Sequence, residues 1–562
     1  MSGSVSNVRQ SRFFAASALV LSLVLAAAVA WPHPTRRRDT PRAGASLPSK
    51  TIAVETNSGP VSRTPVDPMP FEGPYGVESH RIEHENAQPG TTAWEIPAGM
   101  STVAIQGFAD HTYAAAGDAV GLYVTTPSRR FRVEAFRMGY YGGAGARLVW
   151  RSNEIVGRTQ PRCQTTNATN TVSCDNWTPS LQLRLTSAFV QGDYLLKLVA
   201  GGGVGESYVP LTVWDPTSHA AYLIKNDIYT WQAWNPYGGY DFYAGQGNCP
   251  ANVYPICNRA RVVSFDRPYG SGDGAGDFLG NEYPLVRFAE QHNLDVAYAT
   301  DLTVQQHPSF AWAHRALLSL GHDECWSRTE REAAISAVAH GTNIVFFAAS
   351  PVLRHVRLQP SVLGPDREEV DYRDGAADPL NGNGSPLDVT GNTWSSPPAN
   401  WSEDSFVGAA YAGFLEPNAA PADFTVAEGS AWIFNGTGLQ TGSKIPGLLR
   451  SDFDHFESST HPSNEEIFAH SSIPLAQAQS QIGASQGSIY SDMTYYTNPT
   501  SGAGILDTGT NNWIPALSPC PTGTTGCPAP TISKITDNLL RVFGAGPAAQ
   551  KQPATPNWQQ YY

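Results

Sequence analysis

Between residues 71 and 216 the chain is a series of short hydrophobic runs separated by Gly, Asn and Pro. Several runs alternate apolar and polar residues, which is typical of β-strands with one buried face. Because no helical periodicity interrupts them, we predict an all-β, immunoglobulin-like sandwich domain over residues 71–216. The predicted strands are 118–126, 130–138, 146–150, 181–185, 192–200 and 207–215.

After residue 216 the pattern changes to nearly solid apolar runs that alternate with amphipathic segments. Solid apolar strands alternating with helices indicate a parallel sheet covered on both faces. We therefore predict an open α/β layer domain over residues 217–545, with a last helix near 538–547 that ends at Gly544. The other predicted strands are 220–227, 261–266, 294–300, 314–321 and 342–350, and the predicted helices are 281–293 and 328–341.

The two ends of the chain lack the strand and helix patterns of residues 71–545. Phe13 to Trp31 is an uncharged run of 19 residues. That length can span a bilayer, and the small residues 28–30 also resemble a signal-peptide cleavage site. Residues 1–31 are therefore predicted to be a signal peptide or a membrane anchor, and either one would export the rest of the chain. Residues 32–70 and 546–562 lack a hydrophobic period and are predicted to be a disordered linker and a disordered tail.

Composition and charge narrow the classes of partner. Of the 562 residues only 15 % are charged, and the net charge is −13. We therefore expect no basic surface that would recruit DNA, RNA or anionic lipid. The N-terminal segment is the predicted membrane contact, and the sequence leaves open whether the chain forms a homo-oligomer.

The cysteines independently favour export. Six of the seven lie in three close pairs flanked by turn-forming residues, which predicts three local disulfides. No pair has the spacing of a structural zinc site. The predicted pairs are Cys163–Cys174, Cys249–Cys257 and Cys520–Cys527, and Cys325 is left single.

A cluster of chemically capable side chains, residues 322–325, stands between the predicted strand 314–321 and the predicted helix 328–341. In open parallel sheets, ligands bind beyond the carboxyl ends of the strands, so a site is expected here. Polar residues also end such strands without any function, so position alone does not decide. Three further polar residues end other strands of the same set and are expected to face the same crevice: Asp227, Asp301 and Ser350.

Two chemistries are compatible with this cluster. His322 and Glu324 are two residues apart, which on an extended segment puts both side chains on one face and within reach of one metal ion or one water. Asp323 would then point away and cap the N-terminus of the helix that follows. Cys325 could instead be a thiol nucleophile activated by His322 and the helix dipole. Neighbouring carboxylates oppose the thiolate, and the small residues of a nucleophile elbow are missing.

A second polar cluster lies in the stretch SDFDHFES. Asp452, Asp454 and His455 are all side chains that can bind a metal ion. The surrounding sequence specifies no further ligand, so a solvated turn is the simpler interpretation.

Six motifs, in order and with compatible spacing, carry a family resemblance over most of residues 71–545. They are FRMGYYGGAGARLV (136–149), TWQAWNPYGGYDFY (230–243), VSFDRPY (263–269), GHDECWS (321–327), SDMTYYTNPTSGAGILDTGTNNW (491–513) and ITDNLL (535–540). Together they resemble the N,N-dimethylformamidase large-subunit family. The resemblance implies a β-sandwich attached to a core similar to class I glutamine amidotransferases, and an amide hydrolase whose mononuclear iron is held by two tyrosines and a glutamate.

Position by position, the resemblance makes Glu324 and Tyr243 iron ligands and places His322 beside them. The position of the second tyrosine is Trp234, whose indole cannot supply a phenolate, so the implied set is one ligand short. Tyr237 or Tyr240 in the same glycine-rich loop could take its place. Two further positions depart from the family pattern: Ser350 stands where Asn is usual, and Cys325 where Tyr is usual.

The leading hypothesis is hydrolysis of a C–N amide bond of a small or envelope-derived substrate. Iron would act as a Lewis acid and activate a bound water, while His322 or Asp323 carries the proton to the departing amine. The alternative is a non-catalytic envelope protein whose sandwich or crevice binds a glycan or a peptide.

Overall fold

The computed structural model describes residues 69–100, 102–247, 258–480, 488–521 and 526–562, and these described residues belong to one compact unit. The predicted signal or anchor segment 1–31, nearly all of the predicted linker 32–70 and the predicted pair Cys249–Cys257 lie outside the described residues. Within the described ranges, no helix combines the length and the apolar character that crossing a bilayer requires.

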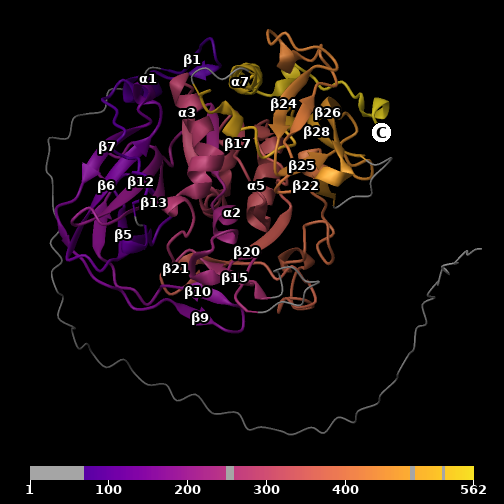
Figure 1. Cartoon of the computed structure of the whole chain (residues 1–562). Helices are drawn as coiled ribbons and strands as arrows, with labels where there is room; N and C mark the ends of the chain where they lie inside the picture. Colours follow the sequence, from indigo (N-terminus) through magenta and orange to yellow (C-terminus); the bar gives the residue numbers. More distant parts are fainter. Residues whose placement is uncertain (1–68, 101, 248–257, 481–487, 522–525) are drawn as a thin grey trace, which may run out of the picture. The chain divides into compact units, whose positions relative to one another are not determined.

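The first part of this unit is a β-sandwich, drawn in indigo and purple in Figure 1. One sheet has the order β11-β5-β3 and the other β4-β13-β12-β6-β7, with β8 (Ile155–Val156) also on β6. Each of the six predicted strand segments overlaps one of these strands, so the predicted sandwich layer is present. The strands are β3 (Gln106–Ala109), β4 (Tyr113–Ala115), β5 (Ala119–Thr125), β6 (Arg130–Met138), β7 (Ala146–Arg151), β11 (Leu181–Arg184), β12 (Gly192–Ala200) and β13 (Glu206–Trp214).

The larger part is built on a seven-stranded sheet of order β16-β14-β17-β19-β29-β28-β26. The first five strands are parallel, whereas β28 and β26 are antiparallel. The prediction of a parallel sheet is therefore right for four predicted strands, β14, β16, β17 and β19, whereas β29, β28 and β26 were not predicted. The strands are β14 (Tyr222–Asn226), β16 (Val296–Thr300), β17 (Ala316–Ser319), β19 (Asn343–Phe346), β26 (Glu466–Pro474), β28 (Ser488–Thr497) and β29 (Gly504–Asp507).

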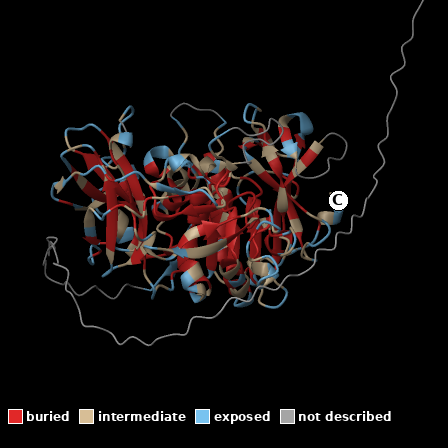
Figure 2. Ribbon diagram, turned by 90° about the horizontal axis from the view of Figure 1, so that it is seen from below, coloured by how far each residue is buried: buried red, intermediate tan, exposed pale blue. Residues whose placement is uncertain are grey.

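The parallel strands of this sheet are predominantly apolar because both faces of the sheet are buried. Successive residues of a strand point to opposite faces. Leu317 packs in the cluster that contains α4 (Asp301–Gln306) and α5 (Arg328–Ala339), and Leu318 in the cluster that contains α3 (Tyr283–Gln291) and α7 (Ala529–Phe543). Buried residues accordingly fill the middle of the molecule in Figure 2.

Smaller sheets complete the fold. The predicted strand 261–266 is β15 (Val262–Ser264), which pairs with β21 in the separate sheet β15-β21-β20-β18 and is not part of the main sheet. The remaining elements are β1 (Phe71–Glu72), β2 (Val77–Glu78), α1 (His80–Asn86), β9 (Gln164–Thr166), β10 (Thr171–Ser173), α2 (Ile228–Ala233), β18 (Cys325–Ser327), β20 (Arg354–Ser361), β21 (Gly364–Val370), α6 (Asp404–Val407), β22 (Ala410–Leu415), β23 (Ala422–Thr425), β24 (Lys444–Leu449), β25 (Asp452–His455) and β27 (Ala478–Ser480).

The C-terminal segment 546–562 is folded, which corrects the prediction of a disordered tail. The side chain of Asn557 donates to the carbonyl of Ile467 at 3.1 Å and accepts from its N–H at 2.7 Å. The Trp558 ring stacks on Phe456 at 5.3 Å. These contacts are made by individual side chains, so no hydrophobic period announces them.

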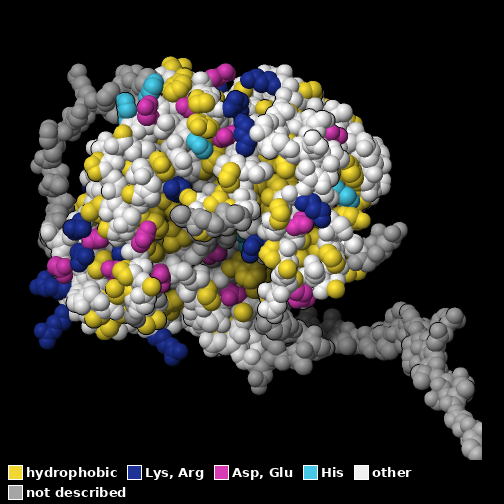
Figure 3. All heavy atoms as spheres, turned by 45° about the horizontal axis from the view of Figure 1, so that its top comes forward, with side chains coloured by type: hydrophobic (Ala, Val, Ile, Leu, Met, Phe, Trp, Pro, Cys, Tyr) yellow, Lys and Arg dark blue, Asp and Glu magenta, His cyan; other side chains and the backbone are white. Residues whose placement is uncertain are grey.

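Two of the predicted disulfides, Cys163–Cys174 and Cys520–Cys527, are present, and Cys325 is free and buried. On the face of the molecule drawn in Figure 3, acidic and basic side chains lie among many uncharged ones.

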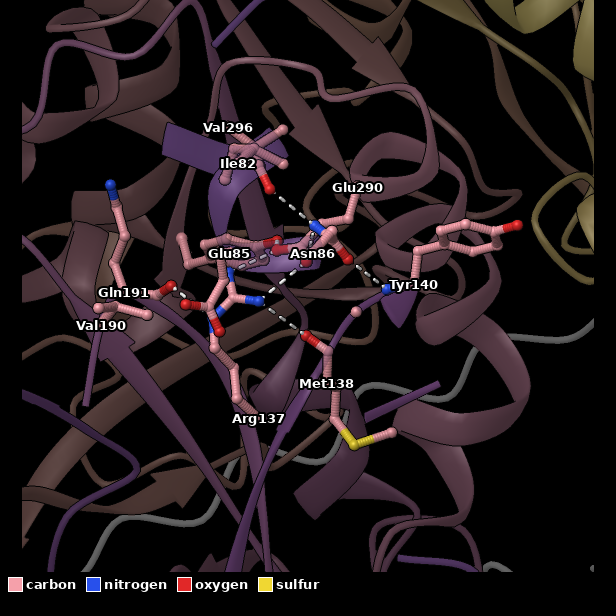
Figure 4. A network of polar contacts seen from close by, with 12 residues as sticks. Ile82, Glu85, Asn86, Arg137, Met138, Tyr140, Val190, Gln191, Glu290 and Val296 are labelled. Atoms are coloured by element: carbon pink, nitrogen blue, oxygen red, sulfur yellow. Dashed lines mark hydrogen bonds and ion pairs between the residues drawn. The ribbon is translucent and has the colours of Figure 1, made fainter. Parts of the chain in front are cut away.

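A buried ion pair joins the sandwich to the α/β part. Arg137 of β6 and Glu290 of α3 make two hydrogen bonds, of 2.8 and 2.5 Å, and neither side chain is exposed. Asn86 of α1 donates to the same carboxylate at 2.9 Å. Figure 4 shows these side chains converging. Arg137 lies in the motif FRMGYYGGAGARLV, so part of that motif holds the two layers together.

Candidate functional site

The polar cluster 322–325 lies beyond the carboxyl end of β17, the middle one of the five parallel strands, as predicted. The chain turns at Gly321, which has a φ of +55° and whose Cβ, if present, would lie 2.7 Å from the carbonyl oxygen of Asn281. Only glycine fits such a position without strain. The short strand β18 follows, and Ser327 then caps α5 by accepting from the N–H of Glu330. The helix cap is therefore Ser327, and the expectation that Asp323 caps it is wrong.

Glu324 is the centre of the candidate site. Its Oε2 accepts hydrogen bonds from the Tyr243 hydroxyl and from the Trp234 indole, the latter at 3.1 Å. Its Oε1 accepts from Nε of Arg354 at 2.9 Å. The structure thus brings Tyr243 and Glu324 together although 81 residues separate them. We call Trp234, Tyr243, His322, Glu324, Arg354 and Asp452 the Glu324 site.

His322 lies between two carboxylates. Its Nε2 is 3.5 Å from Oε2 of Glu324 and 3.3 Å from Oδ2 of Asp452. Asp452 comes from β25, and Asn511 also donates to it at 3.2 Å. The interpretation of Asp452 as part of a solvated turn is therefore wrong, because it lies in a strand and faces His322. Its neighbours Asp454 and His455 are buried in the same strand.

Stacked rings form one wall of the site. The ring centroids of Trp234 and Tyr243 are 3.5 Å apart, and the guanidinium carbon of Arg373 is 4.0 Å from the Tyr243 centroid. Since Trp234 covers one face of the phenol ring, Arg373 covers the other. Trp234 is 40 % exposed, so this wall borders solvent.

The loop that carries these aromatic residues is held by Arg267 of the motif VSFDRPY. Its guanidinium donates to the carbonyl oxygens of Tyr237 and Tyr240 at 3.0 and 2.8 Å. The ring of Tyr237 packs with Phe108 and Trp177 in a small core cluster of the sandwich. Among the described residues, the hydrogen bonds to the Glu324 side chain come from Trp234, Tyr243 and Arg354, so neither Tyr237 nor Tyr240 takes the place of a missing ligand.

The charges of the site follow from its neighbours. Burial would raise the pKa of Glu324, but the positive charges of Arg354 and His322 lower it to about 2. Burial would lower the pKa of His322, but its contact with Asp452 and the charge of Glu324 raise it to about 9. At neutral pH the site therefore holds a carboxylate and an imidazolium.

Asp323 faces away from the site. Its side chain is fully buried, and its Oδ2 accepts from Oγ of Ser319 at 2.6 Å and lies 2.8 Å from Nζ of Lys225. Burial raises its pKa to about 6. Two other predicted residues lie in the same buried region: Asp301 pairs with Lys225, and Asp227 accepts from the Trp231 indole at 2.7 Å.

The side chains of Cys325 and Ser350 also do not take part in the Glu324 site. The Cys325 thiol is completely buried, and burial together with the nearby Glu369 and Glu324 raises its pKa. A thiolate is therefore disfavoured there. The backbone N–H of Ser350 donates to both oxygens of Asp454, at 2.8 and 2.9 Å, and its hydroxyl donates to the carbonyl of Ala349.

Sequence reasoning did not place Arg354 and Asp452 in the Glu324 site, or Arg373 beside it. Arg354 begins β20 and Asp452 begins β25, strands whose pairing the sequence pattern does not reveal. The sequence does contain one signal for Arg354: it is a basic residue beside an apolar run in an acidic chain, which favours an arginine paired with a carboxylate. Its partner could not be identified from spacing.

The iron set implied by the resemblance does not fit these residues. An ion bound by both Tyr243 and Glu324 would have to contact Oε2 of Glu324, which already accepts from the Trp234 N–H. The other oxygen, Oε1, accepts from Arg354. Hard cations need several oxygen or nitrogen acceptors, whereas both oxygens of Glu324 already accept from N–H donors, Trp234 and Arg354. Within the described part of the chain, no group of three or more His, Cys, Asp or Glu residues is placed to hold a metal ion.

The chain matches the model of a known protein family. The family model described as "N,N-dimethylformamidase beta subunit-like, C-terminal" matches residues 132–527. This segment includes most of the sandwich, the whole Glu324 site and the main sheet. No curated protein matches the chain.

Proposed function

Because the chain belongs to the N,N-dimethylformamidase beta subunit-like family, we propose that its Glu324 site hydrolyses a C–N amide bond. The observation that carries the proposal is the position of His322, whose Nε2 lies 3.5 Å from Glu324 and 3.3 Å from Asp452 at the carboxyl end of the sheet. An imidazolium beside a carboxylate that borders solvent is a proton donor next to a proton acceptor.

In the proposed reaction Asp452 accepts a proton from a water as the water oxygen bonds to the amide carbon. The tetrahedral intermediate carries negative charge, which His322 and Arg354 stabilise through their positive charges. His322 then gives its proton to the amide nitrogen as the C–N bond breaks. Asp452 returns its proton to His322 across the 3.3 Å contact, so the products are an acid and an amine and the site is restored.

The other side chains bind and orient. The stacked Trp234 and Tyr243 rings offer an apolar wall to the alkyl groups of the amide. Glu324 is held ionised by Arg354 and fixes the Trp234 indole and the Tyr243 hydroxyl. Its low pKa, about 2, makes it a poor base, which is why the proton acceptor is assigned to Asp452.

The proposal also includes the kind of core fold and the export of the chain. The order of the parallel strands, β16-β14-β17-β19-β29, is the doubly wound order 2-1-3-4-5 and supports a core of the class I glutamine amidotransferase kind. Export is supported by the two disulfides and by the N-terminal apolar segment.

The test is release of amine from simple amides by the purified full chain. N,N-dimethylformamide and N-methylacetamide serve as probes, and His322→Gln and Asp452→Asn are each expected to slow release by at least about 100-fold. The control His340→Gln changes an exposed histidine at the end of α5 and is expected to leave the rate unchanged. Stoichiometric iron that is lost together with activity in Glu324→Gln would contradict the roles of Asp452 as the base and His322 as the acid.

A second candidate function is binding of an amide-containing or glycan ligand without turnover. The observation in its favour is Trp234, which stands where the resemblance implies a ligating tyrosine and is 40 % exposed. Binding of a probe that is lost in Trp234→Ala, with no amine released by the unmodified chain, would favour it over hydrolysis.

A further inference from the structure

Lys225 is a fully buried lysine beneath the Glu324 site. It stands near the end of β14, the strand between β16 and β17. Its Nζ pairs with Oδ1 of Asp301, and it lies 2.8 Å from Oδ2 of Asp323 and 2.9 Å from Oε1 of Glu330. None of these four side chains is exposed, and the ammonium also lies 4.6 Å from the centre of the Trp326 ring. One cation thus meets three carboxylates.

Each of the three carboxylates holds a different element of the site. Oδ2 of Asp301 accepts from the N–H of Tyr229 at 2.8 Å, at the start of the helix α2 that leads into Trp234. Asp323 is the residue between His322 and Glu324, and its backbone carbonyl also accepts from the N–H of Val352 at 3.2 Å.

The third carboxylate secures the element that follows. Glu330 lies in the first turn of α5, whose cap Ser327 ends the short strand β18. The ammonium therefore connects the end of β14, the turn 321–324, the start of α2 and the start of α5. A charged group with such partners is held in one geometry, since moving any element would leave a buried charge unpaired.

We propose that Lys225 is the positioning residue of the Glu324 site: through Asp323 it fixes the turn that presents His322 and Glu324, and through Asp301 the helix that presents Trp234. Asp323 accordingly acts through this turn and does not itself carry the proton of the reaction. The catalytic consequence of this role rests on the proposed function, whereas its structural consequence does not.

The first test is hydrogen exchange of the full chain, followed by mass spectrometry. Lys225→Met is expected to speed deuterium uptake at least about threefold in peptides that cover 228–236 and 318–327, with little change in the sandwich. The matched control is Glu290→Gln, which neutralises an equally buried carboxylate of the Arg137 pair and should leave 318–327 unchanged. Uptake that is unchanged in both peptides, or that rises equally over the whole chain, would overturn the proposal.

Asp323→Asn keeps the shape of the side chain and removes one of the three partners. If Lys225→Met does not fold, Asp323→Asn tests the positioning role of Lys225 in its place. The same local rise in deuterium uptake is expected. If the unmodified chain releases amine, Asp323→Asn should lower kcat. KM and the shape of the pH profile should stay unchanged, because a misplaced turn slows the reaction equally at every pH. Loss of one limb of the pH profile would instead show Asp323 to be a direct proton carrier. If no amide is hydrolysed at all, the proposed function fails while the exchange result still decides the role of Lys225.

Discussion

The guanidinium of Arg354 lies against the carboxylate of Glu324, with Nε 2.9 Å from Oε1, and the two side chains are only 15 % and 5 % exposed. Removal of one member of such a pair leaves the other charge buried without a partner. Arg354→Met is therefore expected to lower the free energy of unfolding by about 3–5 kcal/mol, measured by urea denaturation.

The double variant Arg354→Met/Glu324→Gln provides the control for this prediction. It removes both charges, so most of the lost free energy should return. If the double variant is no more stable than Arg354→Met alone, the loss comes from packing of the arginine stem and not from the unpaired carboxylate.

The pKa of His322, about 9 in the folded chain, predicts a dependence of stability on pH. Because this pKa is above the ordinary value near 6.5, the stabilisation is complete below about pH 6.5 and is lost as the pH rises toward 9. The difference corresponds to about 3 kcal/mol, reduced by the partial exposure of the ring. Urea unfolding from pH 6 to pH 9 should show this loss in the unmodified chain and a flatter curve for His322→Gln. Equal slopes would show that His322 is not protonated at neutral pH.

The ion pair of Arg137 and Glu290 predicts that the sandwich and the α/β part unfold together. Both side chains are fully buried and come from different layers of one compact unit. Arg137→Met is expected to cost about 3–5 kcal/mol and to leave a single thermal transition of lower midpoint. Arg328→Met, which breaks an exposed pair with Glu332, should have little effect. Two separate transitions in the unmodified chain would contradict the prediction.

The elements that the sequence predicts well are those whose burial is regular. Strand β12 is buried along its whole length, and β14 and β17 are buried on both faces, so predominantly apolar runs identify them. The strand near 261–266 also exists, but its partner is β21. A hydrophobic run fixes that a strand forms and does not fix which strand lies beside it.

The candidate site was predictable only where motifs carried it. The motifs point to Tyr243, His322 and Glu324, and the structure places these three side chains together. Arg354 and Asp452 reach the site through pairings between distant strands, which no local pattern specifies. Asp323 differs because a buried lysine, Lys225, draws its side chain to the opposite side from Glu324.

The packed C-terminal segment predicts that its last residues contribute to stability. Asn557 satisfies both the N–H and the carbonyl of Ile467, and its side chain is buried. Asn557→Ala would leave these two groups without partners and is expected to cost about 1–3 kcal/mol. Gln559→Ala, at an exposed position two residues later, is the control. Identical thermal midpoints for both variants and the unmodified chain would show that the segment does not pack in solution.

The burial of Cys325 predicts that its thiol is inert in the folded protein. The side chain is completely buried, and its pKa is raised by burial and by the nearby carboxylates of Glu369 and Glu324. Because the thiolate is the reactive form, iodoacetamide should leave Cys325 unmodified under native conditions and alkylate it after unfolding in urea. Peptide mass spectrometry of the segment that contains Cys325 measures both. Alkylation of the native chain at Cys325 together with loss of amide hydrolysis would instead support a thiol nucleophile and would contradict the assignment of the reaction to His322 and Asp452.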